Sequence, residues 1–277
     1  MSTIPEPQAP TFENIPSQAT FSYEYKELMK SILEELDNSK HPHSHDVAGI
    51  ALNEIVQKLM PFMENYNMEY TQGNIANGQK AASYSLSVVN YVETQYEAVG
   101  KGGYVPKPSG SSNPPFTPSA QDIKYAEAAQ KAIRDFNSFR DETASAAKNK
   151  GIGDPFGSMG QNIADQLYEA IGEHSMSTVN LAADWELSFD MKTNDSGGIK
   201  PVPFSGGGGP VSHTNAQIMQ DFNGAQNQAQ SEAAYLQSES KIANETYQQY
   251  SATQHDIGQN IVNVEKAAVT SSQSAGN

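Results

Sequence analysis

The chain has 277 residues, which is enough to bury a core, and its 9% aromatic content argues against wholesale disorder. Its 32 acidic and 17 basic side chains give a formal net charge of −15, which disfavours nucleic acid and anionic membranes as partners and favours basic ones. The absence of cysteine excludes disulfides, thiolate metal sites and cysteine nucleophiles, and no apolar run approaches the roughly 20 residues that span a bilayer.

The N-terminal part of the chain is predicted to consist of an arm followed by helices. Residues 1–20 contain four prolines among Ser, Thr, Gln and Asn, which is typical of a disordered arm. Residues 21–99 are predicted to form an N-terminal helical region, because apolar residues recur there at steps of three and four. Pro61 is expected to kink this region, and Gly73 and Gly78 are expected to mark a weak zone or a turn.

The middle of the chain is predicted to hold a second helical region between two linkers. Residues 100–119 are rich in Gly, Pro and Ser and form the first linker. Residues 120–192 are predicted to contain helices, one of them at about 158–183, and to end in a strand, because apolar and polar residues alternate from Trp185 onwards. A turn and a Gly-rich linker fill 193–214, where the segment IKPVPF predicts the second arm of a small β-hairpin.

The segment 215–268 is predicted to be one long coiled-coil helix. It contains no proline, and its apolar residues follow one another at steps of three, four or their sum. A helix of this length would span about 80 Å, and its apolar coverage is too narrow for it to be stable alone, so it must pack along another helix. Residues 269–277 are predicted to form a disordered tail. The apolar row that we expect to form an interface comprises Ile218, Phe222, Leu236, Tyr247, Tyr250, Ile257, Ile261 and Val264.

One short segment has the composition of a metal site. His41, His43, His45 and Asp46 bring three imidazoles and a carboxylate, which are suitable ligands for Zn²⁺ or Ni²⁺, into six residues. Pro42 and a helix that starts at Asp46 explain the segment without a metal. We therefore expect a solvated loop, with a metal site or a pH-sensing site as the alternative.

Motifs for catalysis are absent from the sequence. Neither G-x-S-x-G nor H-E-x-x-H occurs. The glycine-rich segment GIGDPFG misses the dinucleotide-binding spacing by one residue, and SGGGGP lacks the Lys-Ser/Thr pair of a P-loop. Carboxylate pairs such as Asp141 and Glu142 are typical of solvated helix faces. We therefore predict no catalytic residue, no cofactor and no small-molecule substrate. The predicted fold is mainly α: an elongated helical bundle with a long C-terminal coiled-coil helix and a small β-hairpin.

This layout resembles that of bacterial type III secretion substrates. A Ser/Thr/Pro/Asn-rich N-terminus, acidic charge, no cysteine and a long C-terminal helix after a variable middle are similar to needle-tip and filament proteins of those systems, and to chlamydial-type secreted proteins. The N-terminus has neither the basic start nor the apolar stretch of a cleavable signal peptide. The resemblance implies that the chain is secreted, with its N-terminal arm as the export signal.

The sequence thus predicts a non-enzymatic interaction or assembly protein, exported as a tip or filament-like component. Its expected partners are other proteins or copies of itself, bound through the C-terminal helix. Two alternatives stay open: an effector or adaptor that binds a host protein through its helix stripes, and a phage or capsid-associated structural protein. Without export, the chain would be cytoplasmic.

Overall fold

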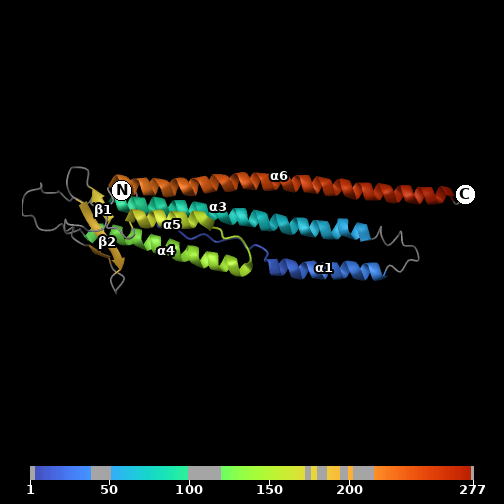
Figure 1. Ribbon diagram of the computed structural model, residues 1–277, viewed down its shortest axis with the longest axis horizontal. Coiled ribbons are helices and arrows are strands. Elements are labelled where there is room, and N and C mark those ends of the chain that lie inside the picture. Colours follow the sequence, from blue (N-terminus) through green and yellow to red (C-terminus); the bar gives the residue numbers. More distant parts are fainter. Residues whose placement is uncertain are drawn as a thin grey trace, which may run out of the picture. The chain divides into compact units, whose positions relative to one another are not determined.

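The computed structural model describes residues 4–38, 51–98, 120–171, 176–179, 186–193, 199–201 and 215–275. The chain is mainly helical, as predicted (Figure 1). The predicted linker at 100–119, Trp185 and most of the segment 193–214 lie outside the described residues. The helical elements are α1 (Gln18–Asn38), a π-helix (Ile55–Leu59), α3 (Met60–Ala98), α4 (Ala120–Lys150), α5 (Gly157–Ile171) and α6 (Asn215–Ala275).

Two helix ends differ from the predicted ones. α5 ends at Ile171 instead of continuing to 183, and the β-branched residues Thr178 and Val179 favour the extended backbone that is found there. α6 continues through residues 269–275, for which a disordered tail was expected. No Pro or Gly interrupts these seven residues, so nothing in their backbone chemistry stops the helix.

Three short strands lie between α5 and α6 in the sequence. They are β1 (Met176–Val179), β2 (Glu186–Thr193) and β3 (Ile199–Pro201), paired antiparallel in the order β1-β2-β3. The residues that join β2 to β3 lie outside the described part of the chain. The small β-hairpin therefore stays a prediction.

The π-helix is the local distortion that accompanies Pro61. The backbone N–H of Met60 donates to the carbonyl oxygen of Ile55, a step of five residues instead of four. Proline has no N–H, and its ring crowds the carbonyl four residues earlier, so a widened turn just before Pro61 relieves the clash.

By their internal contacts, the residues fall into two compact units. The helices α3, α4 and α6 each contribute to both of them. The first unit comprises Met1–Phe12, Asn77–Ala146 and Asp154–Tyr235; the second comprises Glu13–Ala76, Ala147–Gly153 and Leu236–Asn277.

The first unit has a continuous apolar core. Buried side chains from α3, α4, α5 and α6 form one cluster, together with Phe156 from the turn before α5. The ring of Phe156 lies edge-on to Phe136 and Phe139, with centroids 5.8 and 5.9 Å apart. Edge-on aromatic packing contributes free energy in addition to that of apolar burial, and both stabilise the first unit.

Residues 4–12 belong to this unit and residues 13–20 to the second one, which corrects, from residue 4 onwards, the disordered arm expected for residues 1–20. Phe12 stacks on Phe139 with ring centroids 5.7 Å apart, and Lys80 Nζ donates to the carbonyl oxygen of Thr11 at 3.2 Å. Glu6 forms an ion pair with Lys131 of α4. The prolines limit the conformational entropy that is lost on ordering, and Phe12 supplies the apolar burial that offsets the remainder.

In the second unit, α1 packs on the start of α3. Thr20 N–H donates to the hydroxyl of Ser17 at 3.1 Å, which caps the N-terminus of α1. The ring centroids of Phe21 and Tyr66 lie 4.1 Å apart, and Nζ of Lys58, a residue of the π-helix, lies 2.7 Å from Glu35 Oε1. An aromatic contact near one end of α1 thus holds it to α3, and an ion pair near the other end holds it to the π-helix.

Gly73 lets the N-terminal segment approach α3 closely. Ile15 is only 3% exposed, and a Cβ atom at Gly73 would lie 2.8 Å from Ile15 Cγ1. α3 is continuous through Gly73 and Gly78, so the expected weak zone or turn is wrong. The glycine at position 73 provides space for a neighbouring side chain instead of a bend.

The close contact between Gly73 and Ile15 predicts that substitution by alanine has opposite effects on stability at Gly73 and at Gly258. We expect Gly73→Ala to lower the free energy of unfolding by about 1–3 kcal/mol, because the added methyl group forces Ile15 out of its position. Gly258→Ala in α6 is the matched control. A Cβ there meets nothing within 4 Å, and the higher helix propensity of alanine should raise the free energy of unfolding by about 0.5–1 kcal/mol. Urea unfolding of both variants measures this, and a stabilising Gly73→Ala would contradict the close packing.

Candidate functional site

The predicted interface residues of α6 do not share one environment. Phe222 is fully buried in the core of the first unit, where its ring centroid lies 5.7 Å from that of Tyr96. Ala225 and Ala229, on the following turns, are buried beside it. This part of the predicted interface is therefore covered by the chain itself. Ile218 lies in α6, and its side chain is outside the described part.

Beyond Leu236 the predicted interface residues of α6 fall into two rows. Tyr247 and Ile261, with Gln254 midway between them, are seven residues apart and half-buried; we call these three residues the inner row. Leu236, the first predicted interface residue of the second unit, is also half-buried.

The other row faces solvent. Tyr250, Ile257 and Val264 are also seven residues apart, and their side chains are 63%, 37% and 69% exposed. We call them the outer row. Residues at a heptad spacing lie on one line along a helix, and together the two rows form the a and d positions of a helix-packing seam. The second unit covers only the inner half of this seam.

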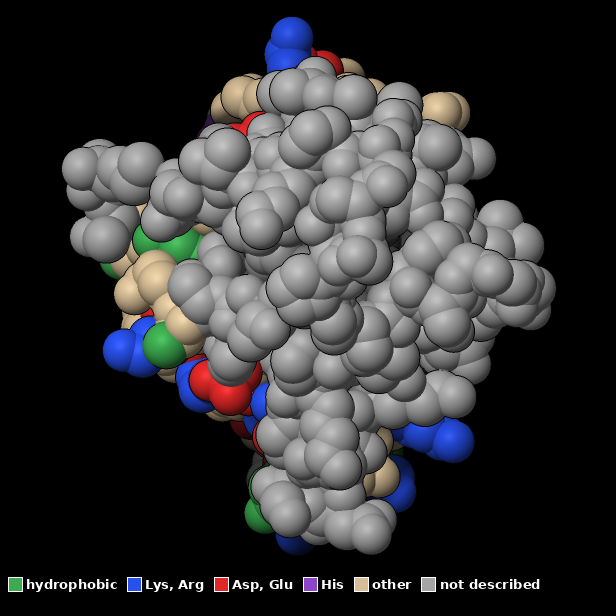
Figure 2. Space-filling view, turned by 90° about the vertical axis from the view of Figure 1, so that its left-hand side faces the viewer, with side chains coloured by type: hydrophobic (Ala, Val, Ile, Leu, Met, Phe, Trp, Pro, Cys, Tyr) green, Lys and Arg blue, Asp and Glu red, His purple; other side chains and the backbone are tan. Residues whose placement is uncertain are grey.

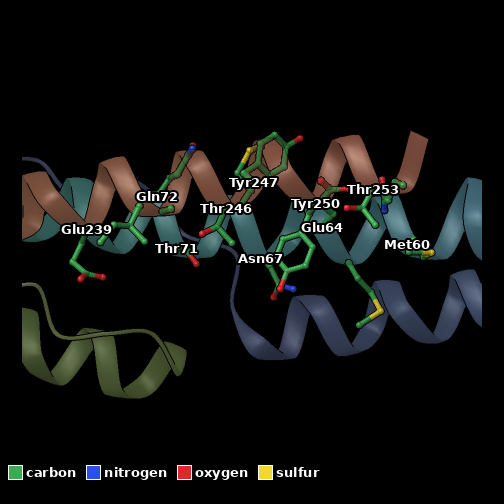
Figure 3. A pocket seen from close by; sticks show the side chains of 15 residues that line it. Met60, Glu64, Asn67, Thr71, Gln72, Glu239, Thr246, Tyr247, Tyr250 and Thr253 are labelled. Atoms are coloured by element: carbon green, nitrogen blue, oxygen red, sulfur yellow. The ribbon is translucent and has the colours of Figure 1, made fainter. Parts of the chain in front are cut away.

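A groove lies next to the outer row, between α3 and α6 in the second unit (Figure 3). The hydrogen bond from Gln72 Nε2 to Asn244 Oδ1, 2.8 Å long, joins the two helices near one end of it. The groove has a volume of about 510 Å³. It is lined by Met60, Met63, Glu64, Asn67, Met68, Thr71 and Gln72 of α3 and by Glu239, Ile242, Ala243, Thr246, Tyr247, Tyr250, Thr253 and Gln254 of α6.

The lining combines flexible apolar side chains with carboxylates. Three methionines of α3 provide an adaptable apolar surface, typical of sites that bind helices. The charged residues of the lining are Glu64 and Glu239. Glu64 Oε1 is buried and has no hydrogen-bond partner among the described residues. A buried carboxylate oxygen without a donor is energetically costly, and a cationic or N–H donor placed there would stabilise it.

Apolar exposure is concentrated in the second unit. Of the 23 buried hydrophobic residues in the described chain, only Ile15, Ile32 and Ala147 belong to it. Yet it holds ten of the twelve large hydrophobic residues that are exposed in the described part of the chain, so most of the exposed apolar surface found there belongs to this unit. These ten are Tyr23, Leu33, Leu52, Ile55, Met63, Ile242, Tyr250, Ile257, Val262 and Val264.

No family model, curated protein or solved structure matches this chain. Its function has to be inferred from its own contacts and charges.

The predicted metal site falls outside the part of the chain that the structure describes. His41, His43, His45 and Asp46 lie outside the described residues, and within those that are described no group of three or more metal-ligating side chains occurs. None of the described helices is long and apolar enough to cross a membrane. In the end view of Figure 2, Lys and Arg side chains are visible at several places around the rim, and acidic side chains lie beside some of them.

Glu93 is a partly buried carboxyl group that links α3 to α6 in the first unit. Gln226 Nε2 donates a hydrogen bond to Glu93 Oε2 and another, of 3.1 Å, to Asn90 Oδ1. Burial raises the pKa of Glu93, and the charge of Glu97 raises it further, while the hydrogen bond from Gln226 lowers it.

The direction of this pKa shift predicts a pH-dependent stability. Because the pKa of Glu93 is higher in the folded chain than in the unfolded chain, its ionisation as the pH rises weakens the folded state. We expect Glu93→Gln to raise the Tm at pH 7 and to lose this advantage below about pH 4, where the carboxyl group is protonated in both states. Thermal unfolding at both pH values, with exposed Glu69→Gln as the control, measures this. An equal gain at both pH values would contradict it.

Proposed function

We propose that this chain is a non-enzymatic helical interaction protein whose second unit is completed by a helix from another polypeptide chain. The outer row of α6 carries the proposal: Tyr250, Ile257 and Val264 repeat every seven residues and are exposed. Large apolar side chains that repeat every seven residues are typical of a helix face that packs against another helix, and a face that contacts only water is usually polar.

In this proposal, α6 and the incoming helix form a coiled coil, and the second unit becomes a complete helical bundle. The inner row is already half-buried, so the incoming helix needs to cover the outer row and the groove, which Tyr247 and Gln254 of the inner row also line. The excess of exposed apolar residues in this unit supports the proposal, because burial of apolar area is the main driving force of association.

The biological setting is a second proposal, which the type III resemblance alone supports. In it the chain is exported without a cleavable signal peptide and assembles as a tip or filament-like component, so that the incoming helix belongs to a neighbouring subunit, either of this protein or of another one in the same assembly. The chain could instead act as a secreted adaptor or effector, or as a phage or capsid-associated structural protein, with the incoming helix supplied by the partner.

Light scattering after size-exclusion chromatography tests the proposed function. The full chain would be measured alone at micromolar concentrations and again with an amphipathic helical peptide of Leu and Lys, about 18 residues or five turns long. We expect association in at least one of the two experiments. A chain that stays monomeric alone and leaves the peptide free would contradict the proposal.

A further inference from the structure

We infer that the groove between α3 and α6 receives a basic amphipathic helix of a different protein. This inference rests on the proposed function and names the chemistry of the partner. The groove offers an apolar floor, carboxylates and a length that suits a short helix.

The dimensions and lining of the groove fit a helix of about four turns. Its lining residues on α6 run from Glu239 to Gln254, a rise of about 22 Å at 1.5 Å per residue. Two antiparallel helices, joined by the hydrogen bond between Gln72 and Asn244, form its walls. A third helix laid in such a trough places apolar residues at i, i+3, i+4 and i+7 against its floor. Met63 and Tyr250, both exposed, are the anchors available for them.

The charges of the groove select a basic occupant. Glu64 and Glu239 are the charged residues that line it, and Glu64 Oε1 is buried without a hydrogen-bond partner among the described residues. Glu64 Oε1 is closed to solvent, so the Glu64 side chain has to turn toward the groove before a Lys or Arg on the incoming helix forms a charge-assisted hydrogen bond with it. The net charge of −15 would also steer a basic partner toward the chain.

The same charges disfavour a second copy of this chain. Between residues 236 and 264, α6 carries Glu239, Glu245 and Asp256 against a single Lys241. A second α6 in the groove would therefore place further carboxylates near Glu64, and like charges that meet across an interface oppose association. A basic helix from another protein relieves this repulsion.

Peptide binding to the full chain tests the inference. One fluorescein-labelled peptide of about 18 residues carries Leu at helix-face spacing and Lys elsewhere, and a second replaces every Lys by Glu. We expect the Leu/Lys peptide to bind with a micromolar Kd and the Leu/Glu peptide to bind at least about tenfold more weakly.

Two matched pairs of substitutions locate the binding site. Glu64→Gln with Glu239→Gln is expected to raise the Kd of the Leu/Lys peptide by about tenfold or more, because charge-assisted hydrogen bonds are lost. Glu69→Gln with Glu245→Gln removes the same charge from exposed positions outside the groove, and we expect less than a threefold change, from screened long-range attraction alone. Far-ultraviolet circular dichroism confirms that each variant is folded.

Three results would overturn the inference. They are equal binding of both peptides, equal weakening by both pairs of substitutions, and no peptide binding at all. If the chain does not bind the peptide but associates with itself through the outer row, the basic partner is wrong and the proposed function stands. If the chain binds nothing and stays monomeric, both are wrong.

Discussion

Replacing Phe222 by alanine is expected to lower the free energy of unfolding of the chain by about 3–5 kcal/mol. The side chain of Phe222 is fully buried, its ring centroid lies 5.7 Å from that of Tyr96, and buried alanines follow it on α6. Removing the ring leaves a cavity that the close-packed helices cannot fill, so both apolar burial and dispersion contacts are lost. Urea unfolding followed by circular dichroism measures the change.

The matched variant on the same helix is Tyr250→Ala. It removes an aromatic ring of similar size that is 63% exposed, so we expect a loss of less than about 1 kcal/mol. The two variants separate an aromatic residue that stabilises the chain itself from one that is available to a partner. Similar losses for both would show that the outer row is part of the chain's own core, and would contradict the division of α6.

Replacing Tyr250 and Ile257 together by aspartate is expected to abolish association through α6. Two carboxylates in the outer row would have to lose their hydration when a helix covers them, and an uncompensated buried charge costs several kcal/mol. Ile261 is not included, because it is half-buried against the chain's own helices and a charge there would damage the second unit. Light scattering, alone and with the Leu/Lys peptide, measures the loss.

The control adds the same two charges to the opposite face of α6. Gln248 and Ala252 are exposed, and nine residues, or two and a half turns, separate Gln248 from Ile257. Aspartate at both control positions is expected to leave association unchanged within about threefold. Full association of the Tyr250→Asp, Ile257→Asp variant, or equal loss in the control, would rule out the outer row as the interface.

The heptad pattern of α6 predicted the helix but not what covers it. Phe222 and Ile257 both belong to the predicted apolar row of α6, yet one is buried in the first unit and the other is exposed. Periodicity identifies the face of a helix that avoids water. It does not say whether that face meets the same chain or another one, because this depends on contacts distant in sequence.

Composition misled the prediction for the N-terminal arm and for Gly73 for a related reason. Proline-rich polar segments are usually disordered, but Phe12 and Ile15 supply enough apolar burial to fix this one. Glycine usually weakens a helix, but at position 73 the missing Cβ is what allows Ile15 to pack.

The groove could be predicted only in part. Met60 and Met63 belong to the region 21–99, whose recurring apolar residues predicted helices, and Tyr250 belongs to the predicted interface. The register that places Gln72 beside Asn244 joins residues 172 positions apart, and no local pattern encodes it. From the sequence alone, Glu64 does not differ from a solvated carboxylate on a helix face. Only the pairing of α3 with α6 shows that it lines the groove.

The central claim is that α6 serves the chain's own core in one part and a partner in another. Hydrogen–deuterium exchange on the full chain, with and without the Leu/Lys peptide, tests it most directly. Amides in residues 219–233 should exchange slowly in both samples, whereas those in 246–264 should exchange at least about tenfold faster alone and slow down when the peptide binds. Equal protection along the whole of α6, with no change on adding the peptide, would contradict the claim.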